Sequence, residues 1–401
     1  MLDDALRKAW LILEDGSVLE GQHFGAPGTA YGELVFTTGM TGYQESLTDP
    51  SFHGQVLMFT YPMIGNYGVN PTDWESDRVW ARAVVVREWC REPSHRGSGK
   101  TLDAWLGEQG VPGISGVDTR ALTLKTRKKG CLRCFVTDDA AQVEGLLARV
   151  ASMPGVEADN LAGEASIDHH ATYGRNDAGH LEDGSAFDKA AYSVAVLDTG
   201  IKRNILRNLV RRFNVHHFPW DATADEVLAS RPDGLFLANG PGDPGHPEIV
   251  AKSIPAIRVL SEATPTFGIC YGNQLIARAW GAGTSKLKFG HRGANIPVRE
   301  EGTHLVRITS QNHGFQVDAA TVAGTGLRVW ETCPNDGCVE GLQHEHLPIF
   351  TTQYHPEAAP GPWDSGKLFD AFWELVDRCA KGTWKPGGFP EMHGKDVAPF
   401  A

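Results

Sequence analysis

The residues with the clearest chemical potential in this sequence are a cysteine, a histidine and a glutamate. Cys270 lies in "GICYGNQ", where a short apolar strand pattern changes to a helical one. A side chain on such a sharp strand-to-helix turn is lifted clear of the sheet. The unpaired N–H groups of the following helix favour the thiolate, which is the nucleophilic form of cysteine. Taken alone, the motif fits a small buried apolar residue equally well, because most free cysteines are buried.

A histidine and a glutamate end a late strand pattern as "YHPE". Residues i and i+2 of a strand point to the same face, so His355 and Glu357 are predicted to lie side by side. An imidazole can take the proton of a thiol, and a carboxylate can orient the ring and stabilise its cation. Alone, His355 would fit a structural histidine. A cysteine on a turn of the same predicted sheet favours a nucleophile, base and carboxylate acting together.

The elements that must position these residues lie in residues 192–384. Buried apolar runs such as "YSVAVLDTG" and "DGLFLANGPGDPG" alternate with amphipathic helical segments, which predicts an α/β domain with a mostly parallel sheet flanked by helices. Sites in such sheets lie beyond the C-terminal ends of the strands. Both "NGPGDP" and Cys270 are at such ends, so we expect them to meet.

The other parts of the chain have different patterns. Residues 1–152 are richer in short strands and turns, with helices predicted at "KTLDAWLGEQG" and "AAQVEGLLARVASM", which indicates a separate, strand-rich α+β domain. Residues 153–191 are polar with little periodicity and are interpreted as a connector. Residues 385–401 are rich in Pro and Gly and are expected to be mobile.

Composition excludes several classes of protein. The chain has 401 residues, 41% hydrophobic and 21% charged, with a formal net charge of −12, which argues against a nucleic-acid or anionic-membrane binder. No apolar run approaches the ~18 residues of a membrane span. The N-terminus carries acidic residues early and is not read as a secretory signal.

The seven cysteines are an odd number in a large chain, which favours reduced thiols and a cytoplasmic protein. Two pairs stand out, Cys131 and Cys134 in "CLRC" and Cys333 and Cys338 in "CPNDGC". The second pair has a spacing unlike that of zinc ligands, and no fourth-ligand pattern stands out. We therefore expect small apolar residues in strands or turns and no metal site.

Together these motifs resemble a known family. "GICYGNQ" and "YHPE" are similar to the class I (triad) glutamine amidotransferases, a domain found in many enzymes. Six further motifs together resemble one member of this group, the small subunit of carbamoyl-phosphate synthetase. They are "GMTGYQESLTDPSF", "TYPMIGNYG", "GISGVDTRALT", "TGIKRNILR", "ANGPGDP" and "QNHGFQVD". The resemblance covers nearly the whole chain, from about residue 10 to residue 380.

The resemblance implies a role for each matching residue. Cys270 would attack the amide carbon of L-glutamine and form a cysteinyl thioester, His355 would act as base and then acid, and Glu357 would hold His355. Backbone N–H groups of Gly242 and Tyr271 would stabilise the oxyanion. The implied glutamine contacts are Ser51, Gly240, Gly242, Tyr271, Gln274, Asn312, Gly314 and Phe315. The commonest elbow of the family has leucine and histidine where this chain has Tyr271 and Asn273.

The resemblance also implies a partner. No G-x-x-x-x-G-K-[ST] loop occurs in the sequence, so ATP, bicarbonate and Mg²⁺ would be used by a large subunit, which would receive the ammonia for carbamoyl phosphate synthesis. Residues 1–152 would form the docking domain for that subunit, and arginine and pyrimidine biosynthesis would be served. Three alternatives stay open: a glutaminase subunit of another amidotransferase, a non-catalytic binding subunit of the same fold, and a cysteine protease.

Overall fold

The computed structural model describes residues 7–392. The chain forms two compact units, of which the first ends at Asp159 and the second begins at Asn160. The predicted two-domain organisation is therefore confirmed. Among the helices of residues 7–392, none has the length and apolar character that a membrane crossing requires.

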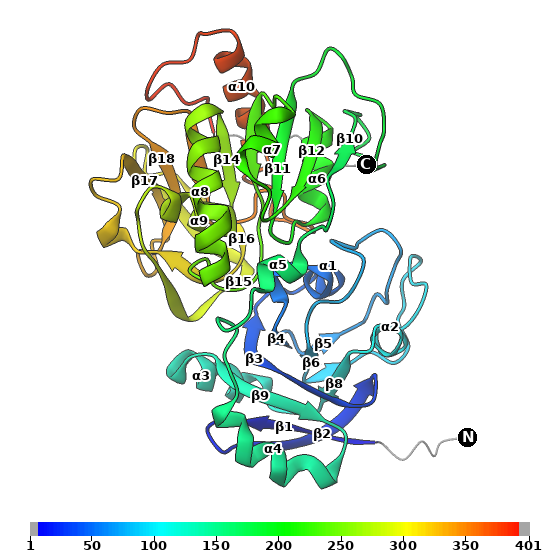
Figure 1. The fold of residues 1–401 in the computed structure, drawn as a ribbon. Coiled ribbons are helices and arrows are strands. Elements are labelled where there is room, and N and C mark those ends of the chain that lie inside the picture. The colour runs from blue at the N-terminus through cyan, green and yellow to red at the C-terminus, as the bar shows by residue number, and fades with distance from the viewer. Residues whose placement is uncertain (1–6, 393–401) are drawn as a thin grey trace. The chain divides into compact units, whose positions relative to one another are not determined.

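Seven strands of the first unit close into a barrel (Figure 1). In barrel order they are β1 (Lys8–Leu13), β2 (Val18–Gly25), β8 (Pro112–Ser115), β6 (Ala83–Val85), β4 (Gln55–Phe59), β3 (Thr29–Thr37) and β9 (Leu132–Thr137). A small separate sheet contains β5 (Met63–Ile64) and β7 (Glu88–Trp89). The strand-rich character agrees with the sequence, but the closure of the sheet was not predicted.

Three α-helices connect strands of this unit, α1 (Tyr43–Thr48), α2 (Leu102–Glu108) and α3 (Thr119–Lys129), and α4 (Val143–Arg149) follows its last strand. Helices α2 and α4 lie inside the two predicted helical segments. The stretch "GYQESLTDPSF", which was expected among strands and turns, forms α1 and the 3-10 helix η1 (Pro50–Phe52). Asp49 explains the second of these, because its side chain accepts a hydrogen bond from the Ser51 N–H group at 2.9 Å.

The second unit is built on a ten-stranded sheet. Its strands, in sheet order, are β10 (Ala171–Tyr173), β12 (Asn214–Pro219), β11 (Ser193–Asp198), β13 (Gly234–Leu237), β14 (Thr266–Ile269), β19 (Ile349–Thr352), β18 (Val339–His344), β17 (Leu327–Thr332), β15 (Thr284–Glu300) and β16 (Val306–Val317). Only β12, β11, β13, β14 and β19 run parallel. The predicted mostly parallel sheet is therefore wrong for the half from β18 to β16, which is antiparallel because consecutive strands there join without crossover helices.

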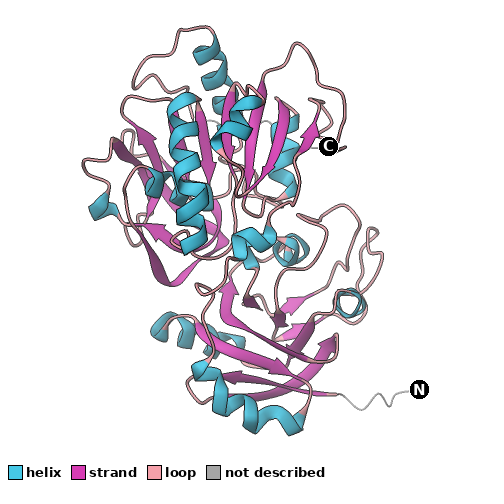
Figure 2. Ribbon diagram, in the orientation of Figure 1, coloured by secondary structure: helices cyan, strands magenta, loops and turns pink. Residues whose placement is uncertain are grey.

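Helices cover both faces of this sheet, as predicted (Figure 2). Successive residues of β11 point to opposite faces. Val194 and Val196 pack with α6 (Arg203–Val210) and α10 (Leu368–Ala380). Ala195 and Leu197 pack in the other cluster, which includes residues of α7 (Ala224–Ala229), α8 (Pro247–Ala263) and α9 (Tyr271–Ala279). The buried strands of the centre thus hold the C-terminal strand ends, and the turns that follow them, in fixed positions.

Two segments differ from the sequence prediction. The predicted connector, residues 153–191, contains α5 (Leu161–Ala165) and β10, which extends the sheet by antiparallel pairing with β12. The predicted mobile tail, residues 385–401, is ordered as far as it is described, because Phe389 packs against the core and Met392 is only 4% exposed within it. The rest of that prediction falls on residues 393–401, which lie outside the described part of the chain.

Candidate active site

Cys270 lies on a strained turn between β14 and α9. Its φ of 56° and ψ of −100° are backbone angles that residues with a side chain rarely adopt. Such a conformation costs on the order of 1–3 kcal/mol and is typical of functional turns. The Cys270 N–H group donates to Thr352 O at 2.8 Å, which ties the turn to the end of β19. The sharp strand-to-helix turn that the sequence predicts at Cys270 is therefore present in the structure.

The glycines of "GICYGNQ" make this turn possible. A Cβ atom on Gly272 would lie 2.4 Å from Leu237 O of β13, and one on Gly268 would lie 2.9 Å from the backbone of Gly272. Neither residue can carry a side chain unless the backbone moves. Helix α9 consequently begins in direct contact with the sheet, with Cys270 at its N-cap position.

His355 and Glu357 are paired, but not in the way the sequence predicted. Strand β19 ends at Thr352, so both residues lie in the turn that follows it rather than on one face of a strand. The turn is held by the His355 N–H group, which donates to Ser310 O of β16 at 2.9 Å. His355 Nδ1 lies 2.7 Å from Glu357 Oε1, and both side chains are 1% exposed. The carboxylate thus orients the ring, as the sequence analysis expected.

Lys202, which the sequence analysis did not identify, completes the charge arrangement around Glu357. Its Nζ lies 2.7 Å from Glu357 Oε1. Burial alone raises the pKa of Glu357, but Lys202 and His355 outweigh this and lower it to about 2. Glu357 is therefore a carboxylate at neutral pH. Its backbone O also accepts a hydrogen bond from Asn204 Nδ2, so two of the polar residues of "IKRN", Lys202 and Asn204, hold this turn.

The two side chains that would react, Cys270 and His355, are both buried. Cys270 is 1% exposed, and its Sγ lies 3.7 Å from Asn312 O. His355 Nε2, the nitrogen opposite Glu357, is buried and forms no hydrogen bond among the described residues. A free, buried imidazole nitrogen with an oriented ring is the arrangement that a general base requires.

The two predicted oxyanion donors come from segments that are tied together. Gly242 has a φ of 85°, which glycine adopts without strain. Tyr271 is buried, and its hydroxyl donates to Asp243 O at 3.0 Å. Tyr271, which stands where the family most commonly has leucine, therefore connects the turn at Cys270 to the "NGPGDP" loop.

The other predicted glutamine contacts lie in the second unit, with one exception. Gln274 Nε2 donates to Phe315 O at 2.8 Å and to Gln353 Oε1 at 3.0 Å, so it holds the segment that contains Asn312, Gly314 and Phe315. A Cβ atom on Gly240 would lie 2.1 Å from Thr199 O, so this loop passes very close to the strand ends. Ser51 belongs to the first unit, and its contact with glutamine stays a prediction.

Asn273, the second departure from the family, has a structural explanation. Its Nδ2 donates to Gln353 Oε1 at 3.1 Å, and its Oδ1 accepts from Thr351 Oγ1 at 2.7 Å. Asn273 is fully buried, so these bonds satisfy polar atoms that would otherwise be costly to bury. The side chain therefore links α9 to β19 and does not point to a reacting atom.

Comparison with known proteins identifies the family of this chain. A family model described as carbamoyl-phosphate synthase small chain, CPSase domain, matches residues 11–136, and one described as glutamine amidotransferase class-I matches residues 195–375. Three curated relatives carry the name carbamoyl phosphate synthase small chain. The protein of Akkermansia muciniphila is 46% identical over 92% of this chain and 97% of its own length. The protein of Listeria monocytogenes is 44% identical over 94% of this chain and 99% of its own length. The protein of Staphylococcus saprophyticus is 42% identical over 93% of this chain and 97% of its own length. The chain belongs to the carbamoyl phosphate synthase small chain family.

Proposed function

We propose that this chain hydrolyses L-glutamine through a cysteinyl thioester and supplies the ammonia to a large synthetase subunit. One observation carries the proposal: Cys270 occupies a strained elbow, while in the buried pair His355–Glu357 the His355 Nε2 atom has no hydrogen bond to any residue of the described range 7–392. A glutaminase needs this combination of nucleophile, base and orienting carboxylate. The class I amidotransferase match over residues 195–375 supports glutamine as the substrate.

In the first half of the reaction, His355 Nε2 takes the proton of the Cys270 thiol and Sγ attacks the amide carbon of glutamine. The carbonyl oxygen becomes an oxyanion, for which the backbone N–H groups of Gly242 and Tyr271 are the proposed donors. The imidazolium then gives its proton to the leaving nitrogen, ammonia departs and the thioester remains. Glu357, a carboxylate held by Lys202, stabilises the imidazolium while it exists.

In the second half, a water molecule gives a proton to His355 Nε2 and attacks the thioester carbon. The carbon–sulfur bond breaks, the Cys270 sulfur regains its proton from His355, and glutamate is released. Each removal of an oxyanion donor typically costs about 2.7–4 kcal/mol of transition-state stabilisation, so the connection between Tyr271 and the Gly242 loop has a direct bearing on rate.

The released ammonia needs a consumer that this chain does not supply. We propose that the large subunit combines ammonia with bicarbonate and ATP, with Mg²⁺, for the carbamoyl phosphate used in arginine and pyrimidine biosynthesis. The first unit, for which the sequence predicts bounds of 1–152, is proposed as its docking surface, because it carries none of Cys270, His355 and Glu357. The seven cysteines, an odd number in a large chain, support work in the reducing cytoplasm.

The test is a comparison of two nitrogen sources in the assembled complex. Cys270→Ser is expected to abolish glutamine-dependent synthesis and leave ammonia-dependent synthesis intact, because a hydroxyl is a far weaker nucleophile. Cys379→Ser, at a half-buried cysteine of α10, is the matched control and should keep both activities. Near-normal use of glutamine by Cys270→Ser would refute the assignment.

The docking surface is tested by hydrogen exchange on the intact chain. Protection on adding the large subunit should concentrate in the first unit, and protection confined to the second unit would contradict the proposed docking role.

A further inference from the structure

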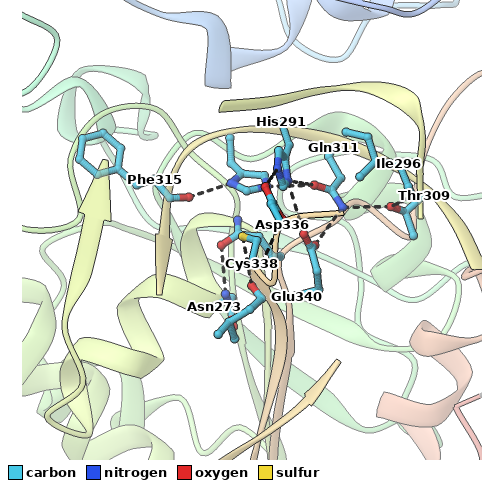
Figure 3. Close-up of polar contacts among 12 residues, drawn as sticks. Asn273, His291, Ile296, Thr309, Gln311, Phe315, Asp336, Cys338 and Glu340 are labelled. Carbon is cyan, nitrogen blue, oxygen red and sulfur yellow. Dashed lines mark hydrogen bonds and ion pairs between the residues drawn. The ribbon is translucent and has the colours of Figure 1, made fainter. Parts of the chain in front are cut away.

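The antiparallel half of the ten-stranded sheet contains a cluster of two histidines, a cysteine and a glutamate. His291 of β15 is paired with His313 of β16 across the ladder. Cys338 directly precedes β18 and Glu340 lies within it, so the two side chains share a face. Figure 3 shows the side chains of His291, Cys338 and Glu340 converging, with Asp336 beside them. One ligand atom from each of the four residues lies within 4.8 Å of the others.

The donor atoms of this cluster suit one kind of cation. Two imidazoles, a thiol and a carboxylate form a mixed set of nitrogen, sulfur and oxygen ligands, which matches Zn²⁺. His313, Cys338 and Glu340 are buried, and His291 is partly buried. Four protein ligands from three strands leave no position for a substrate, as in structural zinc sites.

Both histidines are already oriented as zinc ligands usually are. His291 Nε2 lies 2.8 Å from Asp336 Oδ2, and His313 Nδ1 lies 2.7 Å from Phe315 O. A metal-binding histidine almost always donates its other ring N–H to a carboxylate or a backbone carbonyl. These outer contacts leave His291 Nδ1 and His313 Nε2 for the cluster.

The polar atoms at the centre do not satisfy one another. His313 Nδ1 faces Phe315 O, and His313 Nε2 faces Gln311 Oε1 at 3.0 Å. A neutral ring has a single N–H group, so in that form one of its nitrogens meets an oxygen lone pair. Gln311 Nε2 donates a hydrogen bond to Glu340 Oε2 at 2.9 Å. If the side-chain amide of Gln311 were flipped, its oxygen would face this carboxylate oxygen instead, and two acceptors would meet.

Glu340 adds a second unmet requirement. Its side chain is fully buried, and its Oε1 forms no hydrogen bond among the residues that the structure describes. His291 Nδ1 is 3.5 Å away. This carboxylate oxygen has an ion-pair contact with His291 but no hydrogen bond among the described residues, and a cation between it, the two imidazoles and the thiol would satisfy it.

We propose that His291 Nδ1, His313 Nε2, Cys338 Sγ and Glu340 Oε1 bind one Zn²⁺ ion. Binding displaces the thiol proton of Cys338, because the thiolate is the ligand form, and takes over the bridging position of Gln311 between the two histidines. The ion fastens β15, β16 and β18 together. It thereby steadies the backbone around His313, whose neighbour Asn312 places its carbonyl 3.7 Å from Cys270 Sγ.

A smaller neighbouring group, His291, Cys333 and Asp336, offers an alternative ligand set. It has three ligands rather than four, and it would take Asp336 away from the orientation of His291. Under this proposal Cys338 is a metal ligand, whereas the sequence indicated only small apolar residues for the two cysteines of "CPNDGC". The spacing of the two cysteines could not show this, because three of the proposed ligands lie outside the motif or on another strand.

The test measures metal bound to the intact, reduced chain. After chelation and titration with ZnCl₂ we expect one zinc ion per chain, and with Co²⁺ the thiolate-to-cobalt charge-transfer absorption and tetrahedral visible bands. Cys338→Ser should lose that charge-transfer absorption, whereas the matched control Cys333→Ser should keep it. Asp336→Asn should keep the site but lower zinc affinity by about 10–100-fold, measured by competition with a chelating dye.

Two results would overturn the proposal. One is a folded wild-type chain, judged by circular dichroism and its own melting transition, that binds no zinc or cobalt. The other is loss of the cobalt–thiolate absorption in Cys333→Ser with its retention in Cys338→Ser, which would assign the smaller group instead. These readouts do not depend on glutamine hydrolysis, so they stay decisive whatever the activity of Cys270.

Discussion

Lys202 provides the sharpest test of how the second unit stabilises the buried carboxylate of Glu357. We predict that Lys202→Met lowers the free energy of unfolding of this unit by about 3 kcal/mol at pH 7. The pKa of Glu357 is about 2, against an ordinary value of 4.5, and each tenfold change in the ionisation equilibrium corresponds to about 1.4 kcal/mol. Removal of one partner of a buried ion pair typically costs about 3–5 kcal/mol, which agrees with this magnitude.

The effect has a defined dependence on pH. Because the folded-state pKa of Glu357 lies below its unfolded value, the ionised carboxylate contributes stability above pH 4.5. That contribution is lost as the pH falls from about 4.5 toward 2. In Lys202→Met, burial acts on Glu357 with only His355 left to oppose it, so its pKa rises. The difference between wild type and variant should therefore be constant from pH 8 to about pH 5 and shrink below that.

Urea denaturation followed by hydrogen-exchange mass spectrometry, read on peptides of the second unit, measures this difference at each pH. The matched control is Lys381→Met, which removes an exposed pair with Asp377 and should cost no more than about 1 kcal/mol. In a Glu357→Gln background, Lys202→Met should lose most of its effect. An equal loss in both backgrounds, or a loss independent of pH, would refute the reasoning.

Three further outcomes follow from the same geometry. A glutamine-like electrophile should label Cys270 and spare the other cysteines, as peptide mapping would show; labelling spread over several thiols would contradict its special reactivity. His355→Asn should reduce glutamine hydrolysis nearly as much as loss of Cys270, because the two act as a unit, whereas Glu357→Gln should be milder, and steady-state rates that reverse this order would assign the carboxylate a larger role. Tyr271→Phe should lower kcat by up to about tenfold through loss of a hydrogen bond worth about 0.5–1.5 kcal/mol to Asp243 O, and an unchanged kcat would show that this contact does not position the loop.

Local patterns predicted the parts of the second unit that depend on local physics. The apolar run before Cys270 and the helical spacing after it identify β14 and α9, because a buried parallel strand and an amphipathic helix differ in period. The same patterns missed β15. That strand carries register shifts between Lys286 and His291 and between Gly293 and Ile296, so its side chains do not alternate regularly between buried and exposed.

Contacts between residues far apart in the sequence could not be predicted from local sequence patterns. Nothing near Lys202 in the sequence indicates that it will meet Glu357, and the four proposed zinc ligands are brought together by the antiparallel strands. By contrast, helix α3 had a usable signal that was overlooked. Asp118 caps its first turn by accepting from the Ala121 N–H group, and basic residues fill its last turn before Gly130.

The end of the described chain bears on how this protein can be handled in the laboratory. Met392 is buried, its backbone O lies 3.5 Å from Arg307 Nη1, and its sulfur lies 3.7 Å from Gln343 Nε2. Cutting the chain after α10 would remove Phe389 and Met392 from the core they cover. The uncovered apolar patch would invite aggregation, so an affinity tag belongs beyond residue 392 rather than in place of this segment.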